Sequence, residues 1–464
     1  MAVGLVGLGV MGRNLALNWR DAGQEVVATD AWETARAWRA TGVMVCDDLP
    51  FMLAALSAPR VILLMVKAGE QVDYEIANLV QHLEPGDLIL DGGNSRYRDT
   101  ERRAASLAGR GIGYLGVGIS GGAEGARHGA ALMAGGTAQT WDRARPLLEA
   151  VAAHAPDGVP TVDHFGEGGA GHFVKMVHNG IEYAIMQAIA ECHLLLTQGA
   201  SMGAEQVAGI FARWNGGRGA GFLLEITAEI ANAPDPLTGG VLLDHIADKA
   251  GQKGTGGWTV DAAIEHGVAI PSIMEAVTAR QISGEASARA AMAGLAAPRG
   301  ALGHDGLADD LEAALTGTMI AALAQGLHLY AVAARAKGWD ADLARVLRVW
   351  RAGSILRMDL LDPLARHVEG EDAVLPLAIP AIAQEISALV PAWRRAVAGA
   401  VAGGYPVGVL GGTLAYVEAL ATGTLPTAMV QAQRDRFGAH GFARTDREGA
   451  HHGPWVHPDA GAEA

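Results

Sequence analysis

The chain has 464 residues, of which 50% are hydrophobic and 18% are charged, so it can bury a large core and is not an intrinsically disordered chain. A length of this order corresponds to two or three domains. The formal net charge of −15 argues against a broad surface for nucleic acid or an anionic membrane, but it is compatible with a local basic pocket for an anionic substrate.

The N-terminal segment predicts a nucleotide-binding turn. "MAVGLVGLGVMGRNLALNWRDAG" (1–23) starts as a short apolar strand, continues with Gly7-x-Gly9-x-x-Gly12 and then has a helical pattern, and "EVVATD" (25–30) predicts the next strand. In this context the glycines allow a tight turn and a close approach of the backbone to a pyrophosphate. The start of the helix offers unpaired N–H groups to the same anion.

Asp30 ends the second strand and bears on the choice of cofactor. A carboxylate at this position accepts hydrogen bonds from the ribose hydroxyls of adenosine and repels a 2′-phosphate. Ala31 and Trp32 follow, so no arginine stands beside Asp30 to bind that phosphate. The sequence therefore predicts NAD as the cofactor, with NADP less favoured. The alternative interpretation is that Asp30 caps the N-terminus of a helix.

Three further buried strands extend the predicted parallel sheet, in "RVILLMVKAG" (60–69), "DLILDGGNS" (87–95) and "GIGYLGVGISGG" (111–122). Sheets of this kind bind ligands at the carboxyl ends of their strands. The residues expected to face a polar substrate there are Asn94, Ser120, Gly121 and Gly122. The residues expected to contact the cofactor are Gly7, Gly9, Val10, Met11, Gly12, Asp30, Val66, Lys67, Ala68 and Asn94.

The alternation of strands and helices stops after "HFGEGGAG" (164–171), and a pattern of long apolar and amphipathic helices follows. The fold class predicted is an α/β Rossmann-type N-terminal domain followed by a large all-α domain and a C-terminal tail. The predicted boundaries are 1–168, 169–425 and 426–464.

Two uncharged stretches in the helical part, 313–334 and 396–417, are long enough to span a membrane. The first contains Gln325 and His328, and the second is interrupted by Pro406 and several glycines. We therefore expect buried helices rather than membrane spans.

Cys46 and Cys192 lie far apart in apolar segments, so we expect buried thiols rather than a disulfide or a metal site. The N-terminus has no basic leader typical of a signal peptide, and a cytoplasmic protein is predicted. The polar tail has too few apolar residues to bury a core alone. His451 and His452 have no cysteines or clustered carboxylates beside them, so a solvated tail is expected there and no metal site.

"FVKMVHNGIEY" (173–183) places five polar side chains at the spacing of one helix face. These residues are Lys175, His178, Asn179, Glu182 and Tyr183. A solvated face is one interpretation. A catalytic face is the other, because the helix follows a glycine-rich hinge beside a nucleotide-binding fold and has Asn and His instead of Lys/Glu pairs. These facts alone leave both interpretations open.

Several segments together closely resemble the 6-phosphogluconate dehydrogenase family, the decarboxylating members of the β-hydroxyacid dehydrogenase superfamily. They are "GLGVMGRNLALN", "ILLMVKAG", "DGGN", "SGGAEGAR", "GAGHFVKMVHNGIEY", "KGTGGWT", "TARQIS" and "QAQRDRFGAH". They occur in order from residue 7 to residue 440 and so cover nearly the whole chain. The wider superfamily shares the nucleotide fingerprint, an SGG-like turn and the helix lysine, but lacks the long second half and the last segment.

The resemblance implies a role for each matching residue. Lys175 matches the family's general base and Glu182 its general acid. The residues that match those holding the sugar-acid chain are Asn94, Ser120, Gly121, Gly122, His178 and Asn179. The residues that match the substrate-phosphate site are Tyr183, Lys253, Thr255, Arg280, Arg434 and His440. In the family the last two come from the partner subunit's tail, which implies a homodimer with shared active sites.

The implied reaction is the oxidative decarboxylation of 6-phospho-D-gluconate to D-ribulose 5-phosphate and CO2, with reduction of NAD or NADP. A base removes the O3 proton as hydride leaves C3, a cation or acid polarises the new carbonyl, and an acid protonates the carbon that lost CO2, which becomes C1 of ribulose 5-phosphate. Lys175 can serve the first two steps if burial and nearby cations lower its pKa well below the usual value of about 10.4. Glu182, about two helical turns away, can serve the third. No step needs a metal ion.

The sequence departs from the family's pattern at the cofactor site. Most members have Asn-Arg-Ser or Asn-Arg-Thr where this chain has Asp30-Ala31-Trp32. The arginine of that pattern holds the 2′-phosphate, so its absence puts the family's usual NADP in doubt and strengthens the prediction of NAD.

Two alternative functions remain. A β-hydroxyacid dehydrogenase for a small unphosphorylated acid would not need the cations Lys253, Arg280 and Arg434. A non-catalytic protein that senses a nucleotide would not need Lys175 and Glu182. The physiological role is open between an oxidative pentose phosphate pathway and gluconate utilisation.

Overall fold

The computed structural model describes residues 2–38, 42–295, 297–303, 305–371 and 374–456. It divides into a large compact unit, Met1–Leu414, and a smaller C-terminal unit, Ala415–Ala464.

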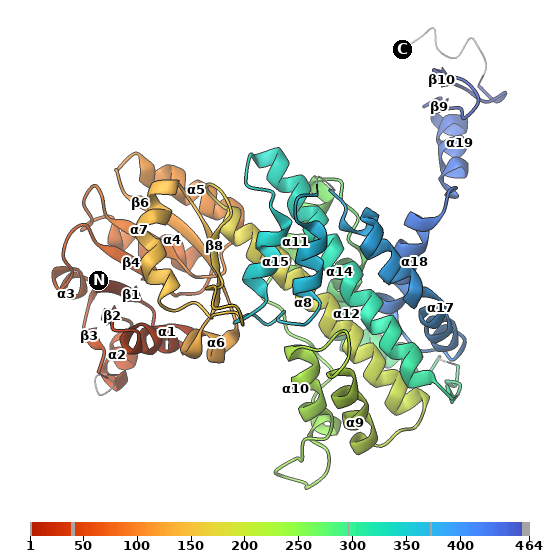
Figure 1. Ribbon diagram of the computed structural model, residues 1–464, viewed down its shortest axis with the longest axis horizontal. Coiled ribbons are helices and arrows are strands. Elements are labelled where there is room, and N and C mark those ends of the chain that lie inside the picture. The colour runs from red at the N-terminus through yellow and green to blue at the C-terminus, as the bar shows by residue number, and fades with distance from the viewer. Residues whose placement is uncertain (1, 39–41, 296, 304, 372–373, 457–464) are drawn as a thin grey trace. The chain divides into compact units, whose positions relative to one another are not determined.

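The large unit begins with a sheet in the order β3-β2-β1-β4-β5-β6-β7-β8 (Figure 1). Strands β1 to β6 run parallel to their neighbours, β7 is antiparallel to β6, and β8 is parallel to β7. The bounds of β1 to β8 are Ala2–Val6, Glu25–Thr29, Met44–Cys46, Val61–Leu64, Leu88–Asp91, Gly113–Ser120, Ala131–Gly135 and Val162–His164. The order of the first six is that of a doubly wound dinucleotide-binding sheet, which confirms the predicted Rossmann-type fold.

Helices α1 to α7 follow the strands and cover both faces of the sheet. Their bounds are Val10–Asp21, Trp32–Trp38, Leu49–Ala54, Glu70–Leu79, Tyr97–Ala108, Gly122–His128 and Ala138–Glu149. Successive strand residues point to opposite faces, so two separate hydrophobic clusters form. Leu15 and Trp19 of α1 belong to one cluster, whereas Met52 of α3 and Leu107 of α5 belong to the other.

The winding of the sheet reverses between β1 and β4, and the loops after β1, β4, β5 and β6 leave at the carboxyl ends of these strands. The first two loops touch, because a Cβ atom on Gly7 would lie 2.5 Å from the carbonyl oxygen of Met65. The backbone N–H of Gly7 also donates to the carbonyl of Thr29 at 3.0 Å. The loops with predicted site residues therefore share the edge at which such sheets bind ligands.

Glycines on both sides of the contact allow α8 (Ala170–Leu194) to pack directly on β6 and β7. A Cβ atom on Gly171 would lie 2.4 Å from the carbonyl oxygen of Met133, and one on Gly118 would lie 2.3 Å from Cβ of Lys175. Neither position has room for a side chain. The sheet and the helices that follow it therefore belong to one compact unit, and the bounds of the three predicted domains stay predictions.

From α8 to α18 the chain is helical, as predicted (Figure 1). The elements are η1 (Leu195–Gly199), α9 (Ala204–Trp214), α10 (Phe222–Ala231), η2 (Leu242–His245), α11 (Thr255–Glu265), α12 (Pro271–Gly284), α13 (Ala286–Ala293), α14 (Leu307–Lys337), α15 (Leu343–Trp350), α16 (Leu361–Val368), η3 (Pro376–Ala378), α17 (Pro380–Ala402) and α18 (Gly408–Ala421).

Helix α14 contains the first uncharged stretch and is long and apolar enough to cross a membrane, but 89% of its most apolar window is buried inside the protein. The second stretch is divided between α17 and α18 by a break at residues 403–407. Both stretches are thus helices of the helical part, as predicted. Cys46 and Cys192 are both buried, which also agrees with the prediction of buried thiols.

The C-terminal unit continues from the end of α18 with α19 (Thr427–Gly438) and a short antiparallel pair, β9 (Phe442–Ala443) and β10 (Ala450–His451). These elements fold around the buried carboxylate of Asp435. It accepts hydrogen bonds from the N–H groups of Gly441 and Gly453 and from the indole of Trp455, and it lies 2.6 Å from Nδ1 of His452.

His452 is exposed, as expected for a solvated tail, but its ring is also bonded to Asp435. The side chain of His452 remains half exposed, at 47%, but it holds the segment after β10 against α19. A polar segment can thus be ordered without an apolar core, because one buried carboxylate collects its N–H donors.

Candidate active site

The glycine-rich turn after β1 has one wall open to a ligand. A Cβ atom on Gly12 would lie 2.0 Å from the carbonyl oxygen of Gly7, so Gly12 is needed for the turn itself. A Cβ atom on Gly9 would meet no protein atom within 4 Å. Gly9 precedes α1 without a side-chain cap, and Val10 is 68% exposed beside it. Open space in front of uncapped helical N–H groups suits the pyrophosphate of a dinucleotide.

Asp30 lies against this turn. Its carboxylate accepts a hydrogen bond from the backbone N–H of Leu8 and another from that of Ala31 at 2.6 Å. The structure places its carboxylate at the turn between Gly7 and Gly9, and these bonds are not those of a helix N-cap, which would go to the second or third residue of α2. Further lone pairs of the carboxylate are left for ribose hydroxyls.

The polar stripe of α8 is a buried face. The exposed fraction of Lys175 is 5%, that of His178 is 0% and those of Asn179 and Tyr183 are 7%. The Lys175 amine donates a hydrogen bond to Oδ1 of Asn179 at 2.7 Å and lies 3.4 Å from Nδ1 of His178. The stripe is therefore not a solvated helix face.

Burial changes the acidity of the amine. Desolvation lowers the pKa of Lys175 from 10.5 to about 8, although the negative charge of Glu182 opposes the change. At pH 7.5 a substantial fraction of the Lys175 side chains is then neutral, whereas an exposed lysine is almost entirely charged at this pH. The group can accept a proton in one form and donate it in the other.

His178 connects the stripe to the glycine turn after β6. Its Nε2 lies 3.0 Å from Oγ of Ser120, and the ring packs edge-on against Trp350 with ring centroids 5.4 Å apart. Burial lowers the pKa of His178 well below its usual value, and the charge of Lys175 adds to the effect. The imidazole is therefore neutral in the described geometry. Trp350, which comes from α15, has no sequence signal that links it to the site.

Glu182 lies between the two ends of the predicted site. Its Oε2 is 3.6 Å from Nδ1 of His178, and its side chain is 21% exposed. Burial raises the pKa of this carboxyl group, whereas the charges of Lys175 and Arg280 lower it. The balance is a carboxylic acid that holds its proton more tightly than an exposed glutamate does.

Several predicted phosphate contacts come together beside Tyr183. The guanidinium of Arg280, on α12, lies over the Tyr183 ring at 3.5 Å from its centroid and donates to the carbonyl of Gly251 at 2.8 Å. This bond ties Arg280 to the loop that carries the exposed Lys253 and leads to Thr255, the buried first residue of α11. Arg280 and the loop are cationic, as a phosphate site requires.

Arg434 and His440 lie in the C-terminal unit. Arg434 is an exposed residue of α19 whose guanidinium donates to Oε1 of Gln431 at 3.2 Å. His440 is also exposed and packs edge-on against Phe437, with ring centroids 5.9 Å apart. Their predicted place at a shared phosphate site stays a prediction.

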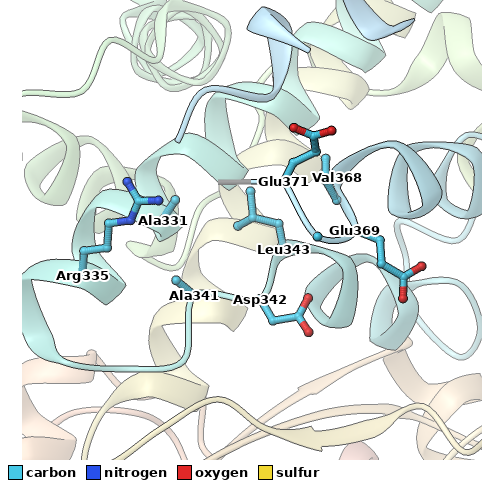
Figure 2. A pocket seen from close by; sticks show the side chains of 9 residues that line it. Ala331, Arg335, Ala341, Asp342, Leu343, Val368, Glu369 and Glu371 are labelled. Carbon is cyan, nitrogen blue, oxygen red and sulfur yellow. The ribbon is translucent and has the colours of Figure 1, made fainter. Parts of the chain in front are cut away.

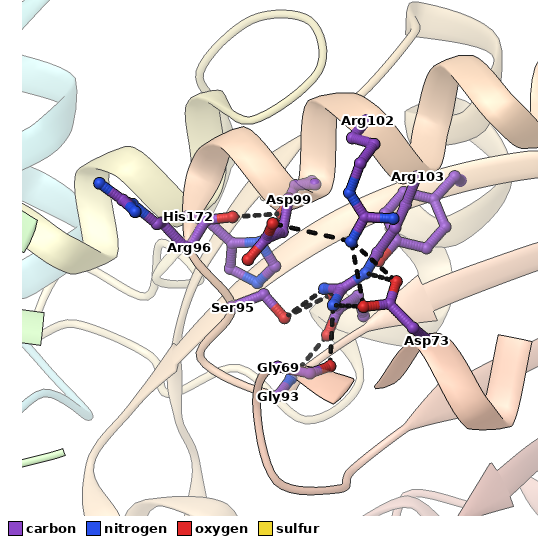
Figure 3. A network of polar contacts seen from close by, with 12 residues as sticks. Gly69, Asp73, Gly93, Ser95, Arg96, Asp99, Arg102, Arg103 and His172 are labelled. Carbon is purple, nitrogen blue, oxygen red and sulfur yellow. Dashed lines mark hydrogen bonds and ion pairs between the residues drawn. The ribbon is translucent and has the colours of Figure 1, made fainter. Parts of the chain in front are cut away.

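The loops after β4 and β5 carry the remaining predicted contacts. Val66 and Ala68 are partly buried and Lys67 is exposed. Asn94 is partly buried and has a φ of 60°, in the left-handed region that Asn tolerates better than most residues. A buried polar network around Arg103 holds both loops (Figure 3), and no sequence signal marks it as part of a site.

A cavity of about 310 Å³ lies elsewhere in the helical part, at the ends of α14, α15 and α16 (Figure 2). Its charged lining residues are Arg335, Asp342, Glu369 and Glu371, and none of them is a predicted site residue. Among the residues that the structure describes, no group of three or more His, Cys, Asp or Glu side chains could hold a metal ion.

A doubly wound sheet, an open glycine turn and a buried lysine with a partly buried glutamate on the same helix are typical of a dehydrogenase of the nicotinamide-dinucleotide class. Residues 2–166 match the family model described as "NAD binding domain of 6-phosphogluconate dehydrogenase", and residues 171–455 match "6-phosphogluconate dehydrogenase, C-terminal domain". The chain therefore belongs to the 6-phosphogluconate dehydrogenase family.

Individual relatives agree over their full lengths. The chain is 42% identical to the decarboxylating 6-phosphogluconate dehydrogenase of Synechococcus elongatus, over 97% of this chain and 98% of that protein. It is 38% identical to the enzyme of Bacillus subtilis named NADP(+)-dependent and decarboxylating, over 98% and 99%. The solved Plasmodium falciparum 6-phosphogluconate dehydrogenase, described with NADP+ and with 6-phosphogluconate, has a TM-score of 0.91 at 35% identity and covers 98% of this chain and 100% of its own.

Proposed function

We propose that this chain converts 6-phosphogluconate to ribulose 5-phosphate and CO2, with Lys175 as general base, Glu182 as general acid and NAD as the preferred cofactor. The observation that carries the proposal is the buried amine of Lys175, held by Asn179 on the face that adjoins the Ser120 turn. Family membership supports the reaction, and the geometry supports the division of roles.

Lys175 performs two steps. When bound, the oxidised nicotinamide supplies the acceptor for the hydride that leaves C3. The neutral amine takes the O3 proton, and the resulting ammonium then polarises the C3 carbonyl and returns the proton to its oxygen as CO2 departs. A pKa of about 8 leaves both forms accessible near neutral pH. The ammonium supplies the positive charge that a metal ion would supply in other decarboxylases.

Glu182 performs the last step. Loss of CO2, which carries away C1 of the substrate, leaves an enediol. The acid protonates the carbon that lost CO2 while Lys175 removes the proton from the hydroxyl on the former C3. Burial, which raises the pKa of Glu182, favours the protonated form that this step needs. The two groups are seven residues apart on α8, or roughly 10 Å along the helix axis, so they can reach different carbons of one extended substrate.

The preference for NAD rests on Asp30. Its carboxylate is fixed beside the glycine turn by Leu8 and Ala31, where it can accept ribose hydroxyls and would repel a 2′-phosphate. The Bacillus subtilis relative is named NADP(+)-dependent, and the Plasmodium falciparum enzyme is described with NADP+. We attribute the difference to Asp30-Ala31 in place of the family's Asn-Arg.

The remaining proposals concern assembly and location. We infer a homodimer in which Arg434 and His440 complete the partner's phosphate site, because both are exposed on a folded C-terminal unit. A cytoplasmic location remains a prediction, as does an active site that needs no metal.

One assay tests the reaction. Protein, NAD and 6-phosphogluconate labelled at C1 are mixed, and absorbance at 340 nm is followed together with release of labelled CO2. Equal amounts of both products are expected. Reduction of NAD without CO2 would favour a dehydrogenase for another 3-hydroxy acid, and cofactor binding without turnover would favour a sensor.

A second assay tests the cofactor. The kcat/KM values for NAD and NADP are compared in the wild type and in the double variant Asp30→Asn/Ala31→Arg. We expect the wild type to favour NAD and the variant to shift at least tenfold towards NADP, because it loses a repelling charge and gains a phosphate ligand. A wild type that strongly prefers NADP would contradict the role of Asp30.

A further inference from the structure

Arg103, on α5, is a buried cation with every donor occupied (Figure 3). Its Nε and Nη2 donate to the two carboxylate oxygens of Asp73, at 2.9 and 3.0 Å, and Nη2 also donates to the carbonyl of Gly69 at 2.9 Å. Its Nη1 donates to Oγ of Ser95 at 3.0 Å and to Oδ2 of Asp91 at 3.4 Å. A guanidinium has five N–H groups, so none is left over.

Asp91, the last residue of β5, holds the backbone on both sides of Asn94. Its Oδ1 accepts from the N–H of Gly93 at 3.0 Å, and its Oδ2 accepts from the hydroxyl of Ser95 at 2.7 Å. The hydroxyl of Tyr114 donates to the same Oδ2 at 2.6 Å. Asn94, with its left-handed φ of 60°, is thus fixed between two residues that are bonded to one buried carboxylate.

The same network reaches the loop after β4. Gly69 ends that loop, and its carbonyl is bonded to Arg103. The two loops also touch, because a Cβ atom on Gly93 would lie 2.9 Å from the carbonyl oxygen of Val66. A single guanidinium therefore connects the loop at 66–69 with the loop at 92–95.

We propose that Arg103, acting through Asp91 and Ser95, is a positioning residue that holds Asn94 and the 66–69 loop in the geometry that binds cofactor and substrate. We call Arg103, Asp91, Ser95 and Asp73 the Arg103 clamp. The proposal rests on the proposed function, in which these loops contact both ligands. A network of buried charges and hydrogen bonds suits this task, since a partly satisfied network is unfavourable and few alternative loop arrangements can satisfy it.

Ser95→Ala is the main test, because it removes one hydroxyl from the clamp and leaves no buried charge without a partner. We expect a loss of about tenfold in kcat/KM, the order that a misplaced contact gives. In an Asn94→Ala background, Ser95→Ala should lower kcat/KM by no more than about twofold, because the side chain that it positions is gone. If Ser95→Ala acted only by destabilising the protein, it would lower kcat/KM by the same factor in the wild-type and Asn94→Ala backgrounds.

Arg103→Lys tests the link to the other loop. Lysine keeps the charge but cannot make five directed bonds, so the dissociation constant for NADH, measured by fluorescence, should rise at least tenfold. Arg102→Ala is the matched control. Arg102 also donates to Asp73 but is 57% exposed, and its loss should change NADH affinity and kcat/KM by less than about twofold.

Two results would overturn the proposal. One is an equal effect of Ser95→Ala with and without Asn94, and the other is wild-type NADH affinity and turnover in Ser95→Ala. If Arg103→Lys does not fold, the Ser95 cycle decides alone. NADH binding is independent of the substrate. If the NADH affinities of these variants follow the expectations but the protein does not turn over 6-phosphogluconate, the proposed function is refuted and the proposal for the Arg103 clamp is retained.

Discussion

Replacing Lys175 by methionine should lower turnover by at least about 10²-fold and make the protein more stable near neutral pH. A pKa of about 8 instead of 10.5 corresponds to about 3 kcal/mol of unfavourable burial, since each pH unit is worth about 1.4 kcal/mol. Loss of the hydrogen bond to Asn179 leaves a buried acceptor and offsets about 1–2 kcal/mol of the gain. The net gain expected at pH 7 is about 1–2 kcal/mol.

The sign of this difference depends on pH. Well below pH 8 the amine is charged in both the folded and the unfolded protein, so at pH 7 the wild type carries nearly the full burial penalty. Between pH 8 and 10.5 the folded protein loses the proton first and the penalty fades. Above pH 10.5 only the lost hydrogen bond remains, and Lys175→Met should then be the less stable protein.

Urea unfolding of wild type and variant at pH 7 and pH 10.5 measures this change, with Lys249→Met as a control at an exposed lysine. The kcat of Lys175→Met for 6-phosphogluconate should fall by a factor of about 10² to 10⁴ or more, the order expected for a general base. A variant that is less stable than wild type at both pH values by the same amount would refute the reasoning, as would near-normal turnover.

Three other predictions each concern the replacement of one residue. Gly9→Ala should change the free energy of unfolding by less than about 0.5 kcal/mol, because its Cβ meets no protein atom within 4 Å, yet weaken NADH binding at least tenfold by fluorescence titration. Arg434→Ala should raise KM for 6-phosphogluconate about tenfold with a smaller effect on kcat, and steady-state kinetics should show no such change for Arg436→Ala on the same helix. Burial raises the pKa of Glu191 to about 7, so the stability of Glu191→Gln relative to wild type, measured by urea unfolding, should rise by up to about 3 kcal/mol as the pH increases from 4.5 to 7. This rise adds to a pH-independent loss, because the N–H groups of Val409 and Leu410 donate to the two carboxylate oxygens and glutamine can accept only one of these bonds; a difference that does not change with pH would contradict the prediction.

The parts of the fold that could be predicted depend on local patterns. A helical spacing determines which side chains share a face, so the stripe from Lys175 to Tyr183 could be read directly. Three glycines after an apolar strand predict the dinucleotide turn in the same way. The burial of the stripe could not be predicted from the sequence. It depends on the absence of a side chain at Gly118, in a distant strand, and on Trp350 in α15.

Two features have no local signal. Strands β7 and β8 are short and one of them reverses direction, so the sequence does not predict them. Arg103 stands in "ERRAA" like any surface arginine, and its partners come from two separate segments, 69–73 and 91–95. A weaker signal exists for Asp91, because a carboxylate at the end of an otherwise apolar strand needs a buried partner.

The acidity of the Lys175 amine tests the central claim most directly. The protein is labelled with 13C at lysine Cε, and the Lys175 resonance is assigned by its absence in Lys175→Met. Its chemical shift should titrate with a midpoint of about 8 in the free enzyme. A midpoint near the usual value of about 10.4 would mean that the amine is solvated and charged at neutral pH, and the proposed base would then be the wrong group.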